Sequence, residues 1–506
     1  MSTVVEDKAV KNKSVQSKKI EKAQTKNSVA GADRVDSRAR ITDVFNQQTD
    51  YALDLRISTI QQRKAVLKRF LKTIEKFTPA IVEAGMQDFN KPEVEVMLAE
   101  IFPVVHEIKH TLKHLSKWMK PKKASPTKAT FGSSSRVIYE PKGVSLIISP
   151  WNYPVNLTFG PLVSALAAGN TAMIKPSEFT PNLSKVISDI VSECFDEKEV
   201  AVFEGEVDVS IALLEKPFDH IFFTGSPQVG KSVMAAAAKN LTSVTLELGG
   251  KSPVVIDSSA NLKKAAQKIA WGKCSNNGQT CIAPDYILVP EQNLDTFVEE
   301  MKLAITGAYG EQIKDNPDYA RVVNVAHTNR IKGLLDDALT NDGEVVFGGE
   351  IDTNERYIAP TLVVGKKGSD KFNNSRIMQE EIFGPLLPII TYQDTHEAIT
   401  HINAHPKPLA LYVFSENKKM TDTVIQKTSS GGVCINENIV HFLQGNLPFG
   451  GVNNSGIGNS HGEYGFKAFS HERAVLQDKF MSNSMLYPPY TKKVTTLAKL
   501  MSKYFS

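Results

Sequence analysis

Residues 143–149 read GVSLIIS, a short, mostly apolar run that begins and ends with small residues. A continuous apolar run of this length is typical of a strand that is buried on both faces of a sheet. Similar runs recur along the chain at 171–175 (TAMIK), 201–204 (AVFE), 219–223 (DHIFF) and 254–257 (VVID). We therefore expect a series of buried strands, closed by the run at 254–257.

Stretches with helical spacing separate these runs. We expect helices near residues 155–168, 182–195, 208–214 and 227–239. Apolar runs that alternate with helices predict an α/β fold with a doubly wound parallel sheet covered on both faces. Such sheets bind ligands beyond the carboxyl ends of their strands, where this chain has several turns with Gly and Pro. Upstream, residues 58–115 also show helical spacing, which ends at the Pro-, Lys- and Ser-rich stretch 121–135.

The chain has 506 residues, which is too many for one ordinary core, so we expect at least two domains. Its 41% hydrophobic and 23% charged residues are ordinary for a globular enzyme. It contains no run of 18 apolar residues and no apolar segment near the N-terminus, so we expect neither a membrane span nor a signal peptide. These features predict an intracellular protein on the cytoplasmic side.

The four cysteines are too few and too far apart for a disulfide scaffold or a zinc site. A reducing compartment fits this usage best, and we expect no bound metal. One of the four could be a nucleophile, and their spacing alone does not identify it. They are Cys194, Cys274, Cys281 and Cys434.

The positive charge is concentrated at the N-terminus. Residues 1–40 contain ten basic and five acidic residues, a net charge of +5, which leaves −1 for the rest of a chain whose total is +4. A basic stretch with few large apolar residues cannot build a core, so we expect a disordered tail. The acidic residues Glu6, Asp7 and Glu21 argue against a mitochondrial presequence. We expect no nucleic-acid partner.

Residues 225–232 read GSPQVGKS and match the phosphate-loop pattern G-x-x-x-x-G-K-[ST] at every position. The run that ends at Asp257 resembles a Walker B strand, so a P-loop nucleotidase is one alternative that these features allow. However, such a loop usually follows the first strand of its domain, and this one lies four strands into the series. The alternative is that Gly225 and Gly230 shape a turn whose helix N-terminus meets a pyrophosphate, with Lys231 on the helix surface.

Three further stretches contain residues that could act in catalysis. They are SPWNYP (149–154), LELGGKSP (246–253) and NNGQTCIAPDY (276–286). They resemble the signatures of the aldehyde dehydrogenase superfamily. The same superfamily is matched by IKPSE (174–178), EEIFGP (380–385) and LPFGG (447–451). Because several independent motifs occur in the right order, the resemblance is specific.

Longer stretches narrow the resemblance. MQEEIFGPLLPI (378–389) and HGEYGFKAFSHER (461–473) are similar to the class 3 group, which includes fatty aldehyde dehydrogenases. The resemblance covers roughly residues 45–490 and implies a homodimer with a small β oligomerisation segment. We expect a dinucleotide-binding domain at 41–122 and 142–247, a catalytic domain at 248–455, oligomerisation segments at 123–141 and 456–480, and a C-terminal tail at 481–506.

Oxidation of an aldehyde to an acid needs a nucleophile, because a free carbonyl cannot release hydride as an alkoxide can. A thiolate adds to the carbonyl to give a thiohemiacetal, and loss of hydride then leaves a thioester for water to hydrolyse. The resemblance implies that Cys281 is the nucleophile and Glu247 the base that activates water. Asn152 is expected to donate its amide N–H to the oxyanion, together with the backbone N–H of Cys281. The other three cysteines are expected to be structural.

The cofactor implied by the resemblance is NAD, with NADP left open. Lys175 and Glu178 follow the strand at 171–175 and are expected to face the adenosine ribose. A glutamate there favours a free 2′-hydroxyl, as in NAD, whereas the nearby lysine could tolerate a 2′-phosphate. Glu381 and Phe383 are expected at the nicotinamide ribose and ring. The pyrophosphate side would be formed by Gly225, Ser226 and Gly230.

Class 3 resemblance implies hydrophobic aldehydes, which are medium- to long-chain or aromatic. Tyr153, Phe159 and Phe449 are candidates for the apolar walls of a substrate site, and a core role fits each of them equally well. Two further alternatives stay open: a non-enzymatic binding protein on this fold, and an enzyme in which only the esterase or thioesterase half-reaction matters.

The C-terminal residues follow a helical pattern from Thr491 onward. An apolar face opposite three lysines is typical of an interfacial helix on an anionic membrane, such as the ER, lipid droplets or the mitochondrial outer membrane. The alternative is a helix packed over the substrate mouth of its own dimer. Related fatty aldehyde dehydrogenases carry a C-terminal membrane span, and residues 491–506 depart from that pattern. The apolar face comprises Val494, Leu497, Ala498, Met501, Tyr504 and Phe505, and the lysines are Lys492, Lys499 and Lys503.

Overall fold

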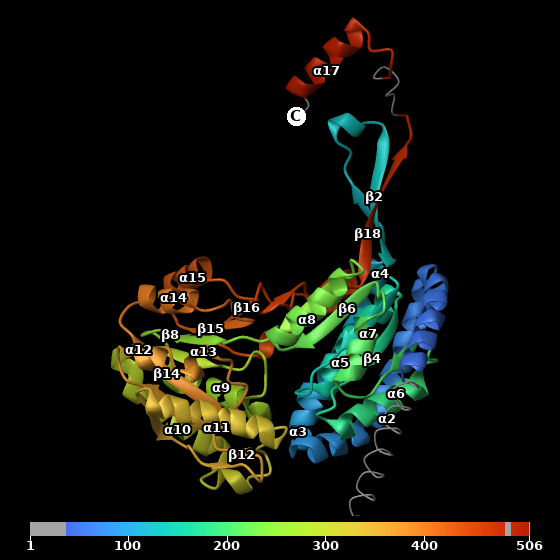
Figure 1. Ribbon diagram of the computed structural model, residues 1–506. Helices are drawn as coiled ribbons and strands as arrows, with labels where there is room; N and C mark the ends of the chain where they lie inside the picture. The colour runs from blue at the N-terminus through green and yellow to red at the C-terminus, as the bar shows by residue number, and fades with distance from the viewer. Residues whose placement is uncertain (1–36, 481–486, 505–506) are drawn as a thin grey trace, which may run out of the picture.

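The computed structural model describes residues 37–480 and 487–504. Its first helix covers residues 37–56, and so includes the last four residues of the expected tail. Residues 1–36, the rest of that tail, lie outside the described residues. Two large sheets lie side by side, and a thin arm projects from the body at one end (Figure 1).

The predicted strand series forms a six-stranded sheet with the order β17-β7-β6-β3-β4-β5. Its strands are β3 (Val144–Ile148), β4 (Thr171–Lys175), β5 (Val200–Val202), β6 (His220–Gly225), β7 (Ser243–Leu248) and β17 (Gly456–Ile457). All neighbours pair in parallel except β17, which is antiparallel to β7. The connecting helices lie close to their predicted positions: α5 (Pro154–Ala168), α6 (Pro181–Cys194), α7 (Val207–Leu214) and α8 (Pro227–Ala238).

The prediction that the run at 254–257 closes this series is wrong. That run, β8 (Pro253–Ile256), belongs to a second, seven-stranded sheet, where it pairs with β9 and β15. The chain leaves the first sheet at Gly249-Gly250. A Cβ atom added to Gly250 would lie 3.3 Å from the Cα atom of Pro408, so the two backbone segments lie close together there. The strand that precedes this crossing, β7, alternates polar and apolar residues, so a search for continuous apolar runs misses it.

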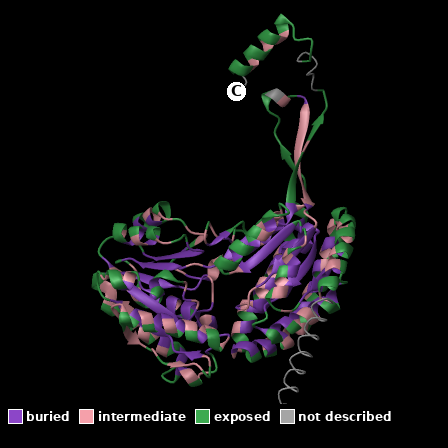
Figure 2. Cartoon of the chain, viewed as in Figure 1, coloured by how far each residue is buried: buried purple, intermediate pink, exposed green. Residues whose placement is uncertain are grey.

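The second sheet has the order β10-β13-β14-β9-β8-β15-β16. Its remaining strands are β9 (Tyr286–Pro290), β10 (Gly343–Phe347), β13 (Thr361–Gly365), β14 (Leu386–Tyr392), β15 (Ala410–Phe414) and β16 (Gly432–Ile435). Its helices are α9 (Leu262–Cys274), α10 (Leu294–Tyr309), α11 (Val325–Thr340), α12 (Asp370–Asn373), α13 (Arg376–Gln379), α14 (Thr395–Ala404) and α15 (Lys418–Lys427). A short pair, β11 (Ile351–Asp352) and β12 (Tyr357–Ile358), lies apart from it. Separate buried clusters cover both faces of each sheet, as Figure 2 shows in purple.

The helical stretch predicted at 58–115 is several helices. α2 (Ile60–Phe89) ends at Asn90, which has a left-handed backbone conformation (φ 52°). The short α3 (Glu93–Val96) follows and continues through a π-helical turn, Met97–Ile101, into α4 (Phe102–Trp118). Asn tolerates the left-handed conformation, and the Pro two residues later disfavours helix at the residue before it. This break brings α3 and the turn after it to the functional site described below.

The arm is a three-stranded antiparallel sheet made of β1 (Lys122–Ala124), β2 (Ser133–Pro141) and β18 (Ser470–Asp478). α16 (Gly462–Ala468) leads into β18. The helix α17 (Lys492–Tyr504) lies beyond the arm, away from both sheets, and none of its residues is buried (Figure 1). Within the described parts of the chain, no helix is both long and apolar enough to cross a membrane.

Candidate active site

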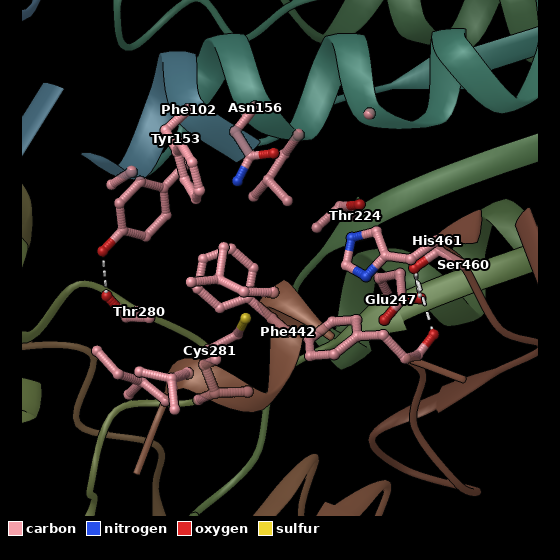
Figure 3. Close-up of a pocket in the computed structure, with 18 of the residues that line it drawn as sticks. Phe102, Tyr153, Asn156, Thr224, Glu247, Thr280, Cys281, Phe442, Ser460 and His461 are labelled. Carbon is pink, nitrogen blue, oxygen red and sulfur yellow. Dashed lines mark hydrogen bonds between the residues drawn. The ribbon is translucent and has the colours of Figure 1, made fainter. Parts of the chain in front are cut away.

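A cavity of about 330 Å³ draws its walls from both halves of the molecule. Cys281, Glu247 and Tyr153 all lie on its surface, although 128 positions separate the first and last of them in the sequence. Figure 3 shows the Cys281 sulfur pointing into this space. Most of the wall is apolar and comprises Leu98, Phe102, Leu157, Trp271, Ile282, Ile439, Val440, Phe442, Leu443 and Phe449.

The loop before Cys281 has a constrained backbone. Three successive residues, Asn276, Asn277 and Gly278, have positive φ angles of 50°, 56° and 71°. Non-glycine residues rarely adopt this region, and such strain is common at functional sites. Gln279 fixes the loop, because its amide donates to the carbonyls of Asn276 (2.9 Å) and Arg321 (3.0 Å) and accepts the backbone N–H of Val323 (2.9 Å).

Cys281 differs from the other three cysteines because it is partly exposed, whereas they are buried. In this structure its thiol is protonated at neutral pH: burial, and then the carboxylates Glu381 and Glu247, raise its pKa to about 12. Backbone N–H groups at Cys281 and Ile282 act in the opposite direction. The thiol therefore needs a base before it can attack a carbonyl. Cys274 ends α9 and is fully packed, as the sequence suggested for a structural cysteine.

Glu247 lies in β7, with its side chain in the cavity wall. Burial raises its pKa to about 8, and the hydrogen bond from Ser460 opposes this only in part. The Ser460 hydroxyl donates to Oε1 at 3.0 Å, whereas Oε2 makes no hydrogen bond within the described protein. The expected rise in the pKa of this carboxyl in apolar surroundings is confirmed. A carboxyl with a pKa near 8 suits a general base at neutral pH.

Asn152 follows β3 and is only 2% exposed. Its side-chain nitrogen donates to the carbonyl of Gln279 at 3.0 Å, which ties it to the loop that carries Cys281. An amide nitrogen has two N–H groups, so one donor remains for another acceptor. Asn152 is not part of the cavity wall, although its neighbour Tyr153 is. The structure thus brings Asn152 beside the nucleophile loop rather than into the open cavity.

The residues expected at the adenosine side lie together. Lys175 ends β4, and its ammonium group forms an ion pair with Glu178 at 2.6 Å. Directly after β6, which is separated from β4 by β3, Ser226 caps α8 by accepting the backbone N–H of Val229. An ideal Cβ on Gly230 would lie 2.7 Å from the side chain of Leu248, so α8 packs too closely on β7 for any larger residue.

Glu381 lies against the loop that follows β7, and Phe383 comes two residues after it. An ideal Cβ on Gly249 would approach Oε2 of Glu381 to 2.1 Å, so a larger residue there would force this carboxylate to move. Burial and then Asp285 raise the pKa of Glu381 to about 8, and its Oε1 makes no hydrogen bond in the described protein. Phe383 has a φ of 47° and packs edge-on against Trp151 at 5.2 Å. A glycine cradle beside a carboxylate with an unused acceptor fits the ribose of a dinucleotide.

The geometry around residues 225–232 does not suit a nucleotidase. Lys231 and Ser232 are exposed on α8. Asp257, which would have to act as the Walker B acid, follows β8 in the other sheet and accepts hydrogen bonds from Ser259 and Ser415. The strand-turn-helix expected at Gly225 is present, but the partners that a P-loop needs are not beside it.

Several cavity residues were missed from the sequence. Ser460 and His461 lie beside Glu247, and Glu95 accepts the backbone N–H of Asn276 at 3.0 Å. No local pattern identifies these residues, since each reaches the cavity only through tertiary packing. Phe159, proposed as a wall residue or core residue, is fully buried away from the cavity.

Comparison with known proteins is consistent with this geometry. A family model described as the aldehyde dehydrogenase family matches residues 10–475. The 4,4'-diaponeurosporen-aldehyde dehydrogenase of Staphylococcus aureus is 45% identical over 86% of this chain and 93% of its own. Aldehyde dehydrogenase family 3 member A2 of Rattus norvegicus is 44% identical over 87% of this chain and 89% of its own.

Solved structures are similar over the same range. The substrate-bound state of Staphylococcus aureus AldH has a TM-score of 0.86 and 43% identity, covering 91% of this chain and 99% of that chain. An indole-3-acetaldehyde dehydrogenase in complex with NAD+ has a TM-score of 0.79 and 25% identity, covering 87% and 89%. The second of these was solved with the type of cofactor that the sequence predicts.

Proposed function

The chain belongs to the aldehyde dehydrogenase family, and we propose that it oxidises hydrophobic aldehydes to carboxylic acids through Cys281. The family uses NAD or NADP, which supplies the hydride acceptor when bound. The observation that carries the proposal is that a thiol and a carboxyl, Cys281 and Glu247, lie in one largely apolar cavity.

In the first half, the Cys281 thiol loses its proton and its sulfur adds to the aldehyde carbon. We assign the base to Glu247, because both groups line the same cavity and the carboxyl pKa is about 8. The carbonyl oxygen becomes an oxyanion, which the backbone N–H of Cys281 and the free amide N–H of Asn152 can stabilise. Loss of such a donor typically lowers the rate about 100- to 1000-fold.

In the second half, a thioester on Cys281 must be hydrolysed. Once Glu247 has released the proton it took from the thiol, it takes a proton from water, the water oxygen attacks the thioester carbon, and the carbon–sulfur bond breaks to release the acid and the Cys281 thiolate, which regains a proton. The unpartnered Oε2 of Glu247 supports this role, because it is free to accept from water. The Ser460 hydroxyl holds the other oxygen in place at 3.0 Å.

For the cofactor, we assign Lys175 and Glu178 to the adenosine ribose, and Glu381 with Phe383 to the nicotinamide side. The turn formed by Gly225, Ser226 and Gly230 would accept the pyrophosphate at the start of α8. The Lys175 ammonium group and the Glu178 carboxylate lie 2.6 Å apart. We expect NAD to be preferred, because Glu178 can accept from a free 2′-hydroxyl, and NADP to be tolerated, because Lys175 can pair with a 2′-phosphate.

The apolar wall supports medium- or long-chain aliphatic aldehydes, or aromatic ones, as substrates. A volume of about 330 Å³ with many aliphatic and aromatic side chains favours burial of a hydrocarbon tail, at about 0.8 kcal/mol for each methylene. Measured kcat/KM on aldehydes from two to sixteen carbons and on benzaldehydes, with NAD and NADP, tests this. We expect KM to fall with chain length up to about ten carbons, and a preference for acetaldehyde would contradict the proposal.

We also propose a homodimer in which the arm makes the subunit contact. β18 is a long, largely exposed strand at the edge of the arm's sheet, and an open sheet edge of this kind is usually covered by a partner. We further propose that the first sheet, at 41–122 and 142–247, binds the dinucleotide and that the second, at 248–455, carries catalysis. Sedimentation equilibrium tests the homodimer, with a dimer mass expected and a monomer mass contradicting it.

For α17 we propose peripheral contact with an anionic membrane on the cytoplasmic side. Val494, Leu497 and Met501 are half-buried along one face of a helix that is otherwise exposed. Phe505, the last residue of the expected apolar face, lies outside the described residues. Lipid contact would bring the enzyme to a source of hydrophobic aldehydes.

A further inference from the structure

A second, smaller cavity adjoins the active-site cavity. Its volume is about 20 Å³, which is enough for one water molecule. His461 and Asn156 line both cavities, so they form part of the wall between them. The smaller cavity also contacts His106 and Glu107 of α4. A water there would have the two to four polar partners that such sites need.

His461 lies beside the general base in space, although the two residues are far apart in the sequence. It follows Ser460, whose hydroxyl donates to Glu247, and Figure 3 shows the imidazole on the same side of the cavity as that carboxyl. Nδ1 of His461 and Oε2 of Glu247 are both buried and make no hydrogen bond within the described protein. Buried polar atoms without partners are uncommon, and proton exchange through water is one reason to retain them.

The far side of the smaller cavity reaches solvent. His106 is exposed on α4, whereas the adjacent Glu107 is buried and accepts the backbone N–H of Gly462 at 2.8 Å. That hydrogen bond stabilises a turn in the left-handed region of the backbone, where His461 and Gly462 have φ angles of 68° and 52°. The imidazole of His461 is therefore fixed between the base and a surface histidine.

We propose that His461 carries the proton from Glu247 to solvent, through one water in the smaller cavity and His106. This rests on the proposed function, which releases a proton at Glu247 in each turnover. A proton enters one ring nitrogen of His461 from Glu247, directly or through water, while the other ring nitrogen releases a proton to the water beside His106. The imidazole stays neutral overall, and no oxidant or reductant is consumed.

The charged neighbours of His461 are compatible with this role. Burial, and then His441 and His106, lower its pKa to about 4, while Glu247 and Glu107 face it across the two cavities. At neutral pH the imidazole of His461 is therefore uncharged, and it does not keep the extra proton that it receives.

The test separates the two half-reactions. With enzyme in excess over the best aldehyde of the panel above, stopped-flow absorbance follows NADH, and acid quench with mass spectrometry follows the acyl group on Cys281. We expect His461→Ala to form NADH within about twofold of the native rate but to lose the acyl group at least tenfold more slowly. Added imidazole should restore acyl loss, because the truncated side chain leaves room for it.

A matched pair on α4 provides a second test that leaves the wall of the active-site cavity unchanged. His106→Gln should slow acyl loss and increase its solvent deuterium isotope effect. His114→Gln, two turns further along the same helix and outside both cavities, should behave as the native enzyme.

The relay is contradicted if His461→Ala loses the acyl group at the native rate, or if NADH formation falls as much as acyl loss and imidazole restores neither. It is also contradicted if His106→Gln and His114→Gln behave alike. Absence of NADH with the native enzyme would instead contradict the proposed function itself.

Discussion

At the scale of single residues, the active site holds its two key acids in their protonated forms. Burial is the largest cause in both cases, raising the pKa of the Cys281 thiol to about 12 and that of the Glu247 carboxyl to about 8. In the resting cavity at neutral pH both groups are therefore mostly protonated, and the ionised fraction of Glu247 acts as the base. Catalysis should become faster as pH rises toward 8, because the ionised fraction of Glu247 increases.

Glu247→Gln should abolish turnover and stabilise the fold at alkaline pH. The folded-state pKa of about 8 lies above the ordinary value of 4.5, so the native state holds this proton more tightly than the unfolded chain. Stability from this group is present below pH 4.5 and is lost as pH rises through 8. The substitution removes that loss, which is on the order of 3–5 kcal/mol at pH 9. Urea denaturation at pH 5 and pH 9 measures it, and equal effects at both pH values would contradict the assignment.

Gly249→Ala should weaken cofactor binding and lower stability, because the new methyl group would lie 2.1 Å from Oε2 of Glu381. We expect at least a tenfold rise in the dissociation constant for NAD, measured by fluorescence titration. Gly307→Ala is the control, since an ideal Cβ there contacts nothing within 4 Å and the position lies inside α10. That change should stabilise the protein by about 0.5–1 kcal/mol. Similar losses of NAD affinity and stability in both variants would contradict a specific role of Gly249 in cofactor binding.

At the scale of elements, the apolar runs predicted β3, β4 and β6 and the helices between them. The pattern failed where a strand has one polar side, as in β7, and where the chain changes sheets, since VVID looks the same in either sheet. The break at Asn90 was also missed, because the helical spacing continues on both sides of it. Local sequence patterns thus predicted well whether a segment is a helix or a strand, but they could not predict which sheet a strand joins.

Lys231→Met, on the exposed surface of α8, should leave NAD binding and turnover unchanged. Lys175→Met should weaken cofactor binding several-fold, because it removes the ion pair with Glu178 at the end of β4. Isothermal titration with NAD and with ATP compares the two variants. Loss of nucleotide binding in Lys231→Met alone would favour the P-loop alternative.

At the scale of the whole molecule, the active site is assembled from both sheets and from the helical layer around α3. The motifs identified Cys281 and Glu247, yet nothing in their spacing predicted that Ser460 and His461 would lie beside them. Such residues reach the site through the crossing at Gly249-Gly250 and the return of the chain through β17, which pairs with β7. Long-range topology of this kind is invisible to local periodicity.

Deletion of residues 491–506 should lower recovery with anionic vesicles in a flotation assay and leave soluble-substrate kinetics unchanged. A full-length variant with Lys492, Lys499 and Lys503 changed to Glu is the control for charge, and it should also fail to float. Unchanged flotation after the deletion would contradict membrane contact. A changed KM for long-chain aldehydes without vesicles would favour the alternative, in which α17 covers the substrate mouth of a dimer.

The most direct test of the central claim is to identify the acylated residue. The enzyme is mixed with NAD and decanal, quenched in acid during turnover, and digested for peptide mass spectrometry. We predict a decanoyl group on Cys281 and on none of Cys194, Cys274 and Cys434, with no adduct and no NADH from Cys281→Ala. An acyl group on another cysteine, or NADH formation by Cys281→Ala at the native rate, would contradict the account.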